Sequence, residues 1–299
     1  MRPLAIVNPA SGGGRCGQAA PRLLSRVAPA IDIETSARPG HASEIVADAY
    51  AAGRRTFVVL GGDGALFEVV NGLPPAAIAD GQTLVCVVPL GTGNSLVRDL
   101  PVLPLDEALA PKARTAARDC DLLRILCRER TFHCANMVSY GFAAAVGRVV
   151  NNHLKPFGAA SYSIGVLWMV ARLAPHLLPY ALDGGRERRE QLTLLSVANS
   201  RYTGAGMLMA PEAEIDDGLM DVVSGEAIGR MKLLRLFPKI FDGSHVDDPA
   251  VRVEKAKSLA FDFDAPVGMI ADGEFVVATP QRIDVAPRAL RMLAIATAA

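Results

Sequence analysis

Three glycine-rich segments near the start of the chain have the composition of phosphate-binding turns. They are residues 8–14 (NPASGGG), 61–64 (GGDG) and 89–94 (PLGTGN), and each follows a short apolar run. Glycine has no Cβ and tolerates positive φ, so its backbone N–H groups can approach an anion closely. A helix that begins after such a turn adds unpaired N–H groups and a dipole that favour phosphate. Three turns in series predict a nucleotide bound along one edge of a parallel sheet.

Asp63 lies inside the second of these turns. A carboxylate is a poor partner for phosphate, whereas Mg²⁺ prefers oxygen ligands and retains part of its water shell. We therefore expect Asp63 to face Mg²⁺ or to order metal-bound water. The alternative is an aspartate that only stabilises its own turn.

A second pair of acids, Asp272 and Glu274, flanks Gly273. In an extended segment side chains alternate, so the two carboxylates would lie on the same side, where one of them could accept a proton from a reacting hydroxyl. The spacing leaves a second interpretation equally open, in which Asp-Gly forms a hairpin turn and both acids are solvated.

The elements that would position these residues alternate in the first third of the chain. Apolar runs predict strands over 4–7, 31–35, 56–60 and 84–88, and helices over 18–27, 42–52, 66–71 and, briefly, near 94–99. Strands that alternate with helices imply a parallel sheet covered on both faces.

The pattern changes near residue 115. Residues 138–150 and 162–174 are expected to be helices or irregular segments, and 183–190 a charged hairpin or loop. Short strands broken by Gly, Pro and Asp are expected over 192–198, 221–224, 251–259, 267–270, 274–278, 281–285 and 289–295. This predicts an α/β domain over residues 1–115 and a mainly antiparallel β domain over 116–299, whose last residues are able to pack back on the first domain.

The bulk composition excludes several classes of protein. Of 299 residues 51% are hydrophobic, and 31 Lys and Arg balance 31 Asp and Glu, which argues against a nucleic-acid partner. The five cysteines are odd in number and lack Cys-x-x-Cys spacing, so we expect buried free thiols. With neither a signal peptide nor an apolar run of about 20 residues, the chain is expected to be cytoplasmic, at most peripheral to a membrane.

The order of the motifs resembles the diacylglycerol kinase catalytic-domain family, which includes bacterial lipid kinases, sphingosine kinases and ceramide kinases. The resemblance rests on residues 8–12, 61–64 with 68–72, 91–94, and 198–206, 210–213, 216–219 and 272–274. It implies an ATP-dependent lipid kinase with the NAD kinase/diacylglycerol kinase-like fold, Mg²⁺ as cofactor, and a diacylglycerol-like or sphingoid-like alcohol entering between the domains.

The resemblance also implies residue roles. Glu274 and Asp272 match the acidic pair that supplies the proton acceptor, with Asp63 as the organiser of Mg²⁺ and water. A structural Mg²⁺ site matches Glu214, Asp217 and Leu219, with main-chain oxygens contributed by Glu214 and Leu219. The ATP contacts match Asn8, Pro9, Ala10, Ser11, Gly12, Thr35, Gly61, Gly62, Asp63, Gly64, Ala65, Leu66, Phe67 and Thr92.

Two positions depart from the family pattern. Ala65 stands where the family often has Thr, and Ser95 where many bacterial members have an aspartate of the metal network. A catalytically silent nucleotide- or lipid-binding regulator therefore stays open as an alternative. An NAD kinase, which shares the Gly-Gly-Asp-Gly turn, is a second one.

Two segments are candidates for contact with the lipid substrate or the membrane. Residues 231–240 are amphipathic and basic, and they fit either transient contact with an anionic membrane surface or a helix that faces the core. Residues 161–175, with Trp168, fit either an acyl-chain groove or ordinary packing. An exposed sheet edge in either domain would support a homodimer.

Overall fold

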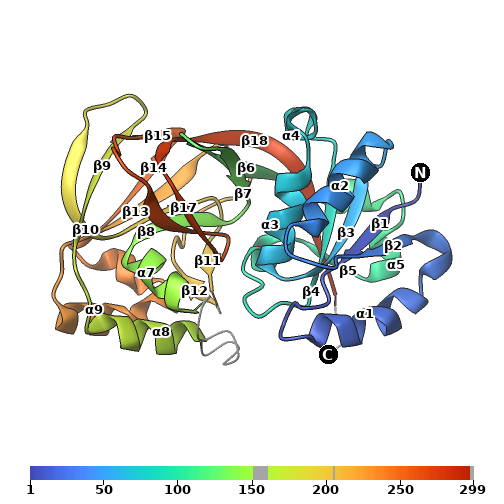
Figure 1. Ribbon diagram of the computed structural model, residues 1–299, viewed down its shortest axis with the longest axis horizontal. Helices are drawn as coiled ribbons and strands as arrows, with labels where there is room; N and C mark the ends of the chain where they lie inside the picture. Colours follow the sequence, from blue (N-terminus) through green and yellow to red (C-terminus); the bar gives the residue numbers. More distant parts are fainter. Residues whose placement is uncertain (151–160, 205, 297–299) are drawn as a thin grey trace. The chain divides into compact units, whose positions relative to one another are not determined.

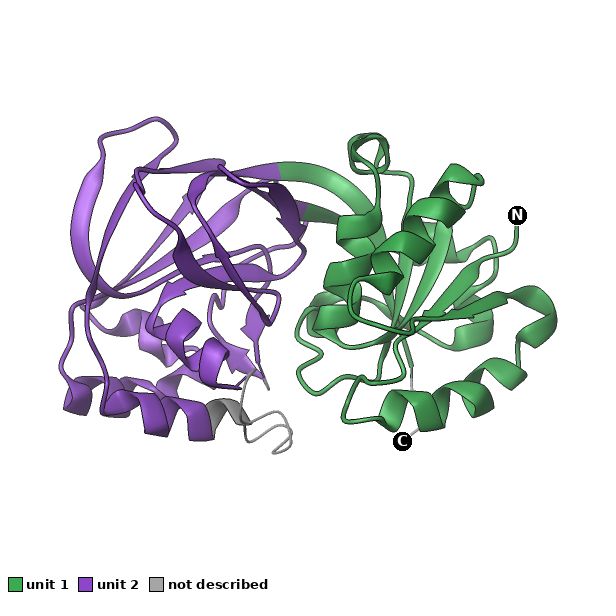
Figure 2. Ribbon diagram, viewed as in Figure 1, with its two compact units in different colours: residues 1–121, 286–299 green, residues 122–285 purple. Residues whose placement is uncertain are grey.

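The chain forms two compact units (Figure 2). The computed structural model describes residues 1–150, 161–204 and 206–296. Unit 1 comprises Met1–Asp121 and Ala286–Ala299, and unit 2 comprises Leu122–Val285. The chain passes from one unit to the other within β6 (Arg118–Cys127) and again within β18 (Pro280–Ile295). The division thus follows residue 121 rather than 115.

Unit 1 is built on a parallel sheet with the strand order β5–β18–β4–β3–β1–β2. The strands other than β18 are β1 (Leu4–Val7), β2 (Asp32–Thr35), β3 (Thr56–Gly61), β4 (Leu84–Pro89) and β5 (Val102–Leu103). The central strands are continuous apolar runs because helices cover both faces of the sheet. The last part of β18 pairs with β4, with Leu293 opposite Cys86.

The helices of unit 1 lie on both faces of its sheet (Figure 1). Helix α1 (Arg15–Ser25) buries Cys16, Ala20 and Leu24 against one face of the sheet. Helices α2 (His41–Ala51) and α3 (Asp63–Gly72) pack together against β1 and β3. Shorter elements are η1 (Ala28–Ala30), α4 (Pro75–Asp80), η2 (Leu96–Asp99), α5 (Leu105–Ala108) and α6 (Ala113–Ala116).

Unit 2 is a mainly antiparallel β structure. Strands β17, β16, β8 and β10 are neighbours in that order, and β10 continues along β9 and β13. The strand bounds are β7 (Thr131–Cys134), β8 (Met137–Gly141), β9 (His176–Leu182), β10 (Arg188–Ala198), β11 (Tyr202–Thr203), β12 (Met207–Leu208), β13 (Met220–Glu226), β14 (Val251–Ala256), β15 (Ser258–Phe261), β16 (Val267–Ala271) and β17 (Glu274–Ala278).

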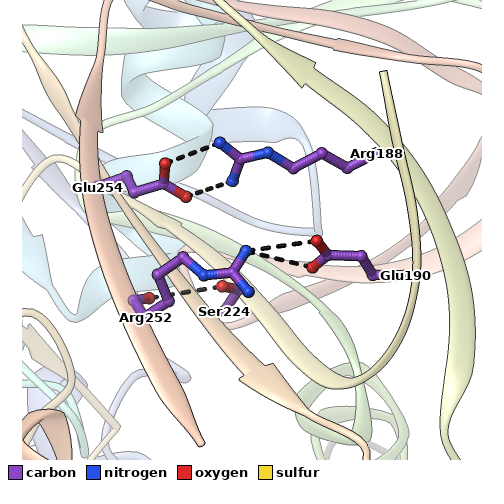
Figure 3. Close-up of polar contacts among 5 residues, drawn as sticks. All are labelled: Arg188, Glu190, Ser224, Arg252 and Glu254. Carbon is purple, nitrogen blue, oxygen red and sulfur yellow. Dashed lines mark hydrogen bonds and ion pairs between the residues drawn. The ribbon is translucent and has the colours of Figure 1, made fainter. Parts of the chain in front are cut away.

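Two ion pairs tie β10 to β14 (Figure 3). Arg188 on β10 makes a bidentate pair with Glu254 on β14, with Nη2 2.8 Å from Oε1. In the reverse sense, Arg252 on β14 pairs with Glu190 on β10 at 3.3 Å. The hydrogen bond from Arg188 is the main reason why the pKa of Glu254 lies below its ordinary value.

The helices of unit 2 gather around one apolar cluster. Helices α7 (Phe142–Val149), α8 (Ser161–Val170) and α9 (Arg230–Leu236) contribute Phe142, Val146, Val166, Met169, Val170 and Leu233 to it. Short 3₁₀ turns, η5 (Pro238–Ile240) and η6 (Ser244–Asp247), follow α9. Among the described residues, no helix is both long and apolar enough to cross a bilayer.

The predicted fold class, a parallel α/β domain followed by a mainly antiparallel β domain, is confirmed. Three local predictions need correction. Residues 138–141 are a strand rather than a helix, and Gly141, at φ 73°, turns the chain from β8 into α7. The expected strand over 251–259 is two strands, and the strands expected over 281–285 and 289–295 are one. All five cysteines are buried and free, as their number and spacing predict.

Candidate active site

The three glycine turns meet at the carboxyl ends of β1, β3 and β4, backbone against backbone. A Cβ on Gly91 would lie 2.3 Å from the Cα of Gly62, and a Cβ on Gly12 would lie 2.4 Å from the carbonyl oxygen of Leu90. Only glycine permits these approaches. The structure therefore brings residues 8–12, 61–65 and 91–94 together, as the sequence motifs predict for a nucleotide site.

Two polar side chains fix the turns relative to one another. Arg15 donates from Nε to the carbonyl oxygen of Gly12 at 2.9 Å and from Nη2 to that of Gly91 at 3.3 Å. Asn94, at φ 49°, accepts the N–H of Gly91 at 3.0 Å and donates to the carbonyl oxygens of Pro89 and Gly91. The site prediction omitted both residues. Two sequence signals could have identified them. Arg15 is a cation that directly follows a glycine run, and Asn94 is an asparagine in a turn that needs positive φ.

Asp63 is the first residue of α3 and joins the second turn to the third. Its Oδ1 and Oδ2 accept the backbone N–H of Ser95 at 2.9 and 3.2 Å. Burial raises the pKa of Asp63, against the opposing hydrogen bonds from Ser95 and Leu96 and the charge of Arg98. Because the backbone N–H of Ser95 donates these hydrogen bonds, the replacement of an aspartate at this position leaves them intact, and the Ser95 side chain adds a further hydrogen bond to Asp63.

Other residues that were predicted to contact ATP lie around the three turns. Thr35 is exposed at the end of β2, opposite Val7 in the register, and so lies at the same sheet edge as Asn8. Ala65 and Leu66 are buried in the first turn of α3. Thr92 is exposed at the tip of the third turn.

In unit 2, Asp272 and Gly273 form a two-residue hairpin turn between β16 and β17. Ala271 pairs with Glu274, and the turn residues have φ of 48° and 88°, the signs of a type I′ turn. The prediction that this segment is extended, with both carboxylates on one side, is wrong because two successive positive φ angles reverse the chain. The other interpretation of the spacing is correct in the Asp-Gly hairpin but wrong in the solvation of both acids, because Asp272 is buried.

The two acids of this hairpin have different surroundings. Asp272 is 4% exposed. Its Oδ2 accepts the N–H of Ala135 at 2.8 Å, and its Oδ1 accepts those of Asn136 and Met137 at 3.0 Å each. Glu274 is half-buried, and its carboxylate has no hydrogen bond or ion pair to any residue that the structure describes. Asp272 thus holds the chain between β7 and β8, whereas Glu274 is available for chemistry.

The predicted structural metal site contains a lysine. Asp217 Oδ1 accepts the N–H of Leu219 at 2.9 Å, and Oδ2 lies 2.8 Å from Nζ of Lys255, which is also 3.4 Å from buried Asp221. Glu214 is exposed. Within the described ranges no three His, Cys, Asp or Glu side chains are grouped to hold a metal. An ammonium group thus lies beside Asp217, the one side-chain ligand that the resemblance implies, and a divalent ion bound there would compete with Lys255 for this carboxylate.

The Asp63 region fits Mg²⁺ better. A buried carboxylate whose burial raises its pKa gains from a nearby cation. Magnesium commonly binds one or two carboxylates together with substrate phosphates and water. Asp63 stands at the turns where those phosphates are expected.

Comparison with known proteins agrees with this geometry. Residues 2–125 match the diacylglycerol kinase catalytic domain, and residues 136–294 match the YegS C-terminal NAD kinase beta sandwich-like domain. A diacylglycerol kinase of Mycobacterium tuberculosis is 32% identical over 97% of this chain and 94% of its own length. The chain belongs to the diacylglycerol kinase family. This confirms the predicted family and the class of enzyme, a lipid kinase.

Two further proteins are similar to this chain over most of its length. A Xanthomonas oryzae pv. oryzae protein named "Probable lipid kinase YegS-like" is 32% identical over 88% of this chain and 86% of its own length. The crystal structure of a diacylglycerol kinase from Bacillus anthracis has a TM-score of 0.67 at 20% identity, covering 98% of this chain and 96% of that one. The latter likeness concerns the fold alone.

Proposed function

We propose that this lipid kinase transfers the γ-phosphoryl group of ATP to the hydroxyl group of a membrane-derived lipid, diacylglycerol-like or sphingoid-like. The contact of the three glycine turns in unit 1 is the observation that carries the ATP part of the proposal. Backbone N–H groups and helix N-termini held this close together are suited to a polyphosphate. The names of the relatives support the lipid part.

Phosphoryl transfer depends on positioning, on charge neutralisation and on a base near the attacking hydroxyl. Asp63 is the residue that would hold Mg²⁺ or its water, and Mg²⁺ would neutralise charge on the β- and γ-phosphates. The glycine turns fix the phosphate chain, while Arg15 and Asn94 keep the turns in place.

Glu274 is the proposed proton acceptor. As the bond between the lipid oxygen and the γ-phosphorus forms, the bond from that phosphorus to the bridging oxygen breaks, and ADP leaves with the electron pair. The hydroxyl proton passes to the Glu274 carboxylate. Asp272 is a positioning residue, since backbone N–H groups engage both its carboxylate oxygens.

A substrate panel tests this proposal. The purified protein is incubated with Mg²⁺, radiolabelled ATP and, separately, diacylglycerol, a sphingoid base, ceramide, monoacylglycerol and NAD. We expect label in at least one lipid, and we expect Asp63→Asn and Glu274→Gln each to lower turnover by about 10²–10⁴-fold. Label only in NAD would favour an NAD kinase. Binding of ATP without transfer to any acceptor would favour a silent regulator.

A further inference from the structure

Helix α8 exposes large apolar side chains on the face turned away from the core. Ile164, Leu167 and Trp168 are 36%, 63% and 49% exposed. Their spacing of three and four residues places them on one side of a helix. The opposite side, with Val166 and Met169, is buried in the cluster shared with α9. A helix that is apolar on both sides is expected to contact a second apolar environment with its exposed side.

Helix α9 also exposes a large apolar side chain. It packs beside α8 along one edge of unit 2 (Figures 1 and 2). Leu233 and Leu236 are buried, whereas Met231 is 64% exposed. We call the exposed side chains of the two helices, together with the cations next to them, the α8–α9 edge; its members are Ile164, Leu167, Trp168, Arg172, Arg230, Met231 and Arg235.

All charged members of the α8–α9 edge are arginines, so its charge is positive. The sequence contains no Asp or Glu between residues 130 and 182, or between 227 and 241, although the whole chain is neutral. Arg172, Arg230 and Arg235 are exposed and form no ion pair with any described residue. Lys232 differs, because it pairs with Asp248 at 2.8 Å. The edge therefore combines apolar side chains with uncompensated positive charge.

We propose that the α8–α9 edge docks on a bilayer that carries anionic phospholipids. Leu167, Trp168 and Met231 enter the boundary between headgroups and acyl chains, and the arginines face the lipid phosphates. Each cation near an anionic surface strengthens binding by about fivefold. The inference rests on the proposed function, because an enzyme whose substrate is a membrane lipid needs such a contact.

Trp168 gives a direct readout, because it is the only tryptophan in the sequence. The protein is mixed, without ATP, with vesicles of phosphatidylcholine or of phosphatidylcholine with phosphatidylglycerol. We expect a blue shift of Trp168 emission, and quenching by lipids brominated on their acyl chains, only with the anionic vesicles. Unchanged emission, or an equal response to both compositions, would overturn the proposal.

Variants test the residues of the edge in the full chain. Arg230→Gln/Arg235→Gln is expected to weaken vesicle binding by about 25-fold, and Leu167→Ser/Met231→Ser by roughly tenfold or more. Arg22→Gln/Arg26→Gln, on exposed positions in or just after α1 of unit 1, is the matched charge control and should bind like the wild type. Equal binding by all three double variants would refute the assignment.

Further outcomes distinguish this inference from the proposed function and from dimer formation. If the edge variants lose vesicle binding but still phosphorylate a dispersed short-chain substrate, the docking role is supported. If the wild type binds vesicles yet phosphorylates no lipid, the proposed function fails and the inference stands. A lipid-free dimer in sedimentation that Leu167→Ser/Met231→Ser abolishes would assign the edge to a second copy and overturn it.

Discussion

Replacing Asp272 by asparagine separates a positioning role from a catalytic one. Three backbone N–H groups, of Ala135, Asn136 and Met137, point at this carboxylate over 2.8–3.0 Å. An asparagine tolerates the φ of 48°. Its single carbonyl oxygen can keep the two donors on Oδ1, but its NH₂ group then faces the N–H of Ala135.

The expected loss follows from these contacts. One charge-assisted hydrogen bond disappears and one buried donor is left without an acceptor, which together cost about 2–4 kcal/mol. For a domain of the size of unit 2, this corresponds to a Tm lower by about 4–16 °C. The Glu274 carboxylate makes no such bonds within the described residues, so Glu274→Gln should leave Tm within about 2 °C while lowering turnover.

Differential scanning calorimetry of both variants, combined with turnover measured well below the lower Tm, is the test. Glu274→Gln also controls for the loss of one negative charge in the same hairpin. The reasoning is refuted if Asp272→Asn melts like the wild type. It is refuted equally if Glu274→Gln keeps full activity while a folded Asp272→Asn protein is inactive, because Asp272 would then be the proton acceptor.

Four further predictions follow from single contacts. Gly91→Ala forces a Cβ against Gly62 and should weaken ATP binding at least tenfold in a titration, whereas Gly229→Ala, where a Cβ meets open space, should not. His245 is 3% exposed, and burial lowers its pKa below 6.5. The unfolded state therefore binds the proton more readily than the folded state, so Tm should fall as pH decreases from about 6.5. The fall should be less steep in His245→Gln. A double-mutant cycle of Arg188→Met and Glu254→Gln should give a coupling energy of about 1 kcal/mol that shrinks in 1 M NaCl; an unchanged value would show that the pair is not electrostatic. Lys255→Met leaves Asp217 and buried Asp221 without their cation and should lower Tm. Mg²⁺ should raise Tm again, in part, only in the variant. A rise of the wild-type Tm with Mg²⁺ would instead support the predicted metal site.

Local sequence patterns were sufficient for the first half of the molecule. Residues 4–7, 57–60 and 84–88 are apolar throughout because they are buried between helices, and glycine turns follow them. The order of the turns indicated the family. In unit 2, β6, β7 and β9 were not anticipated, because antiparallel strands with irregular burial have no such local signature.

The amino-acid sequence by itself determined the α/β class, the three glycine turns and the acidic residues that chemistry requires, because each depends on residue type and short spacing. Only the tertiary structure decided which groups those acids contact. The carboxylate of Asp272 is held by amides more than 130 positions away in the chain, and that of Asp217 by a lysine 38 positions away. Glu274 has no such partner among the described residues. Pairing over such separations depends on how strands are brought together, a property that no local pattern encodes.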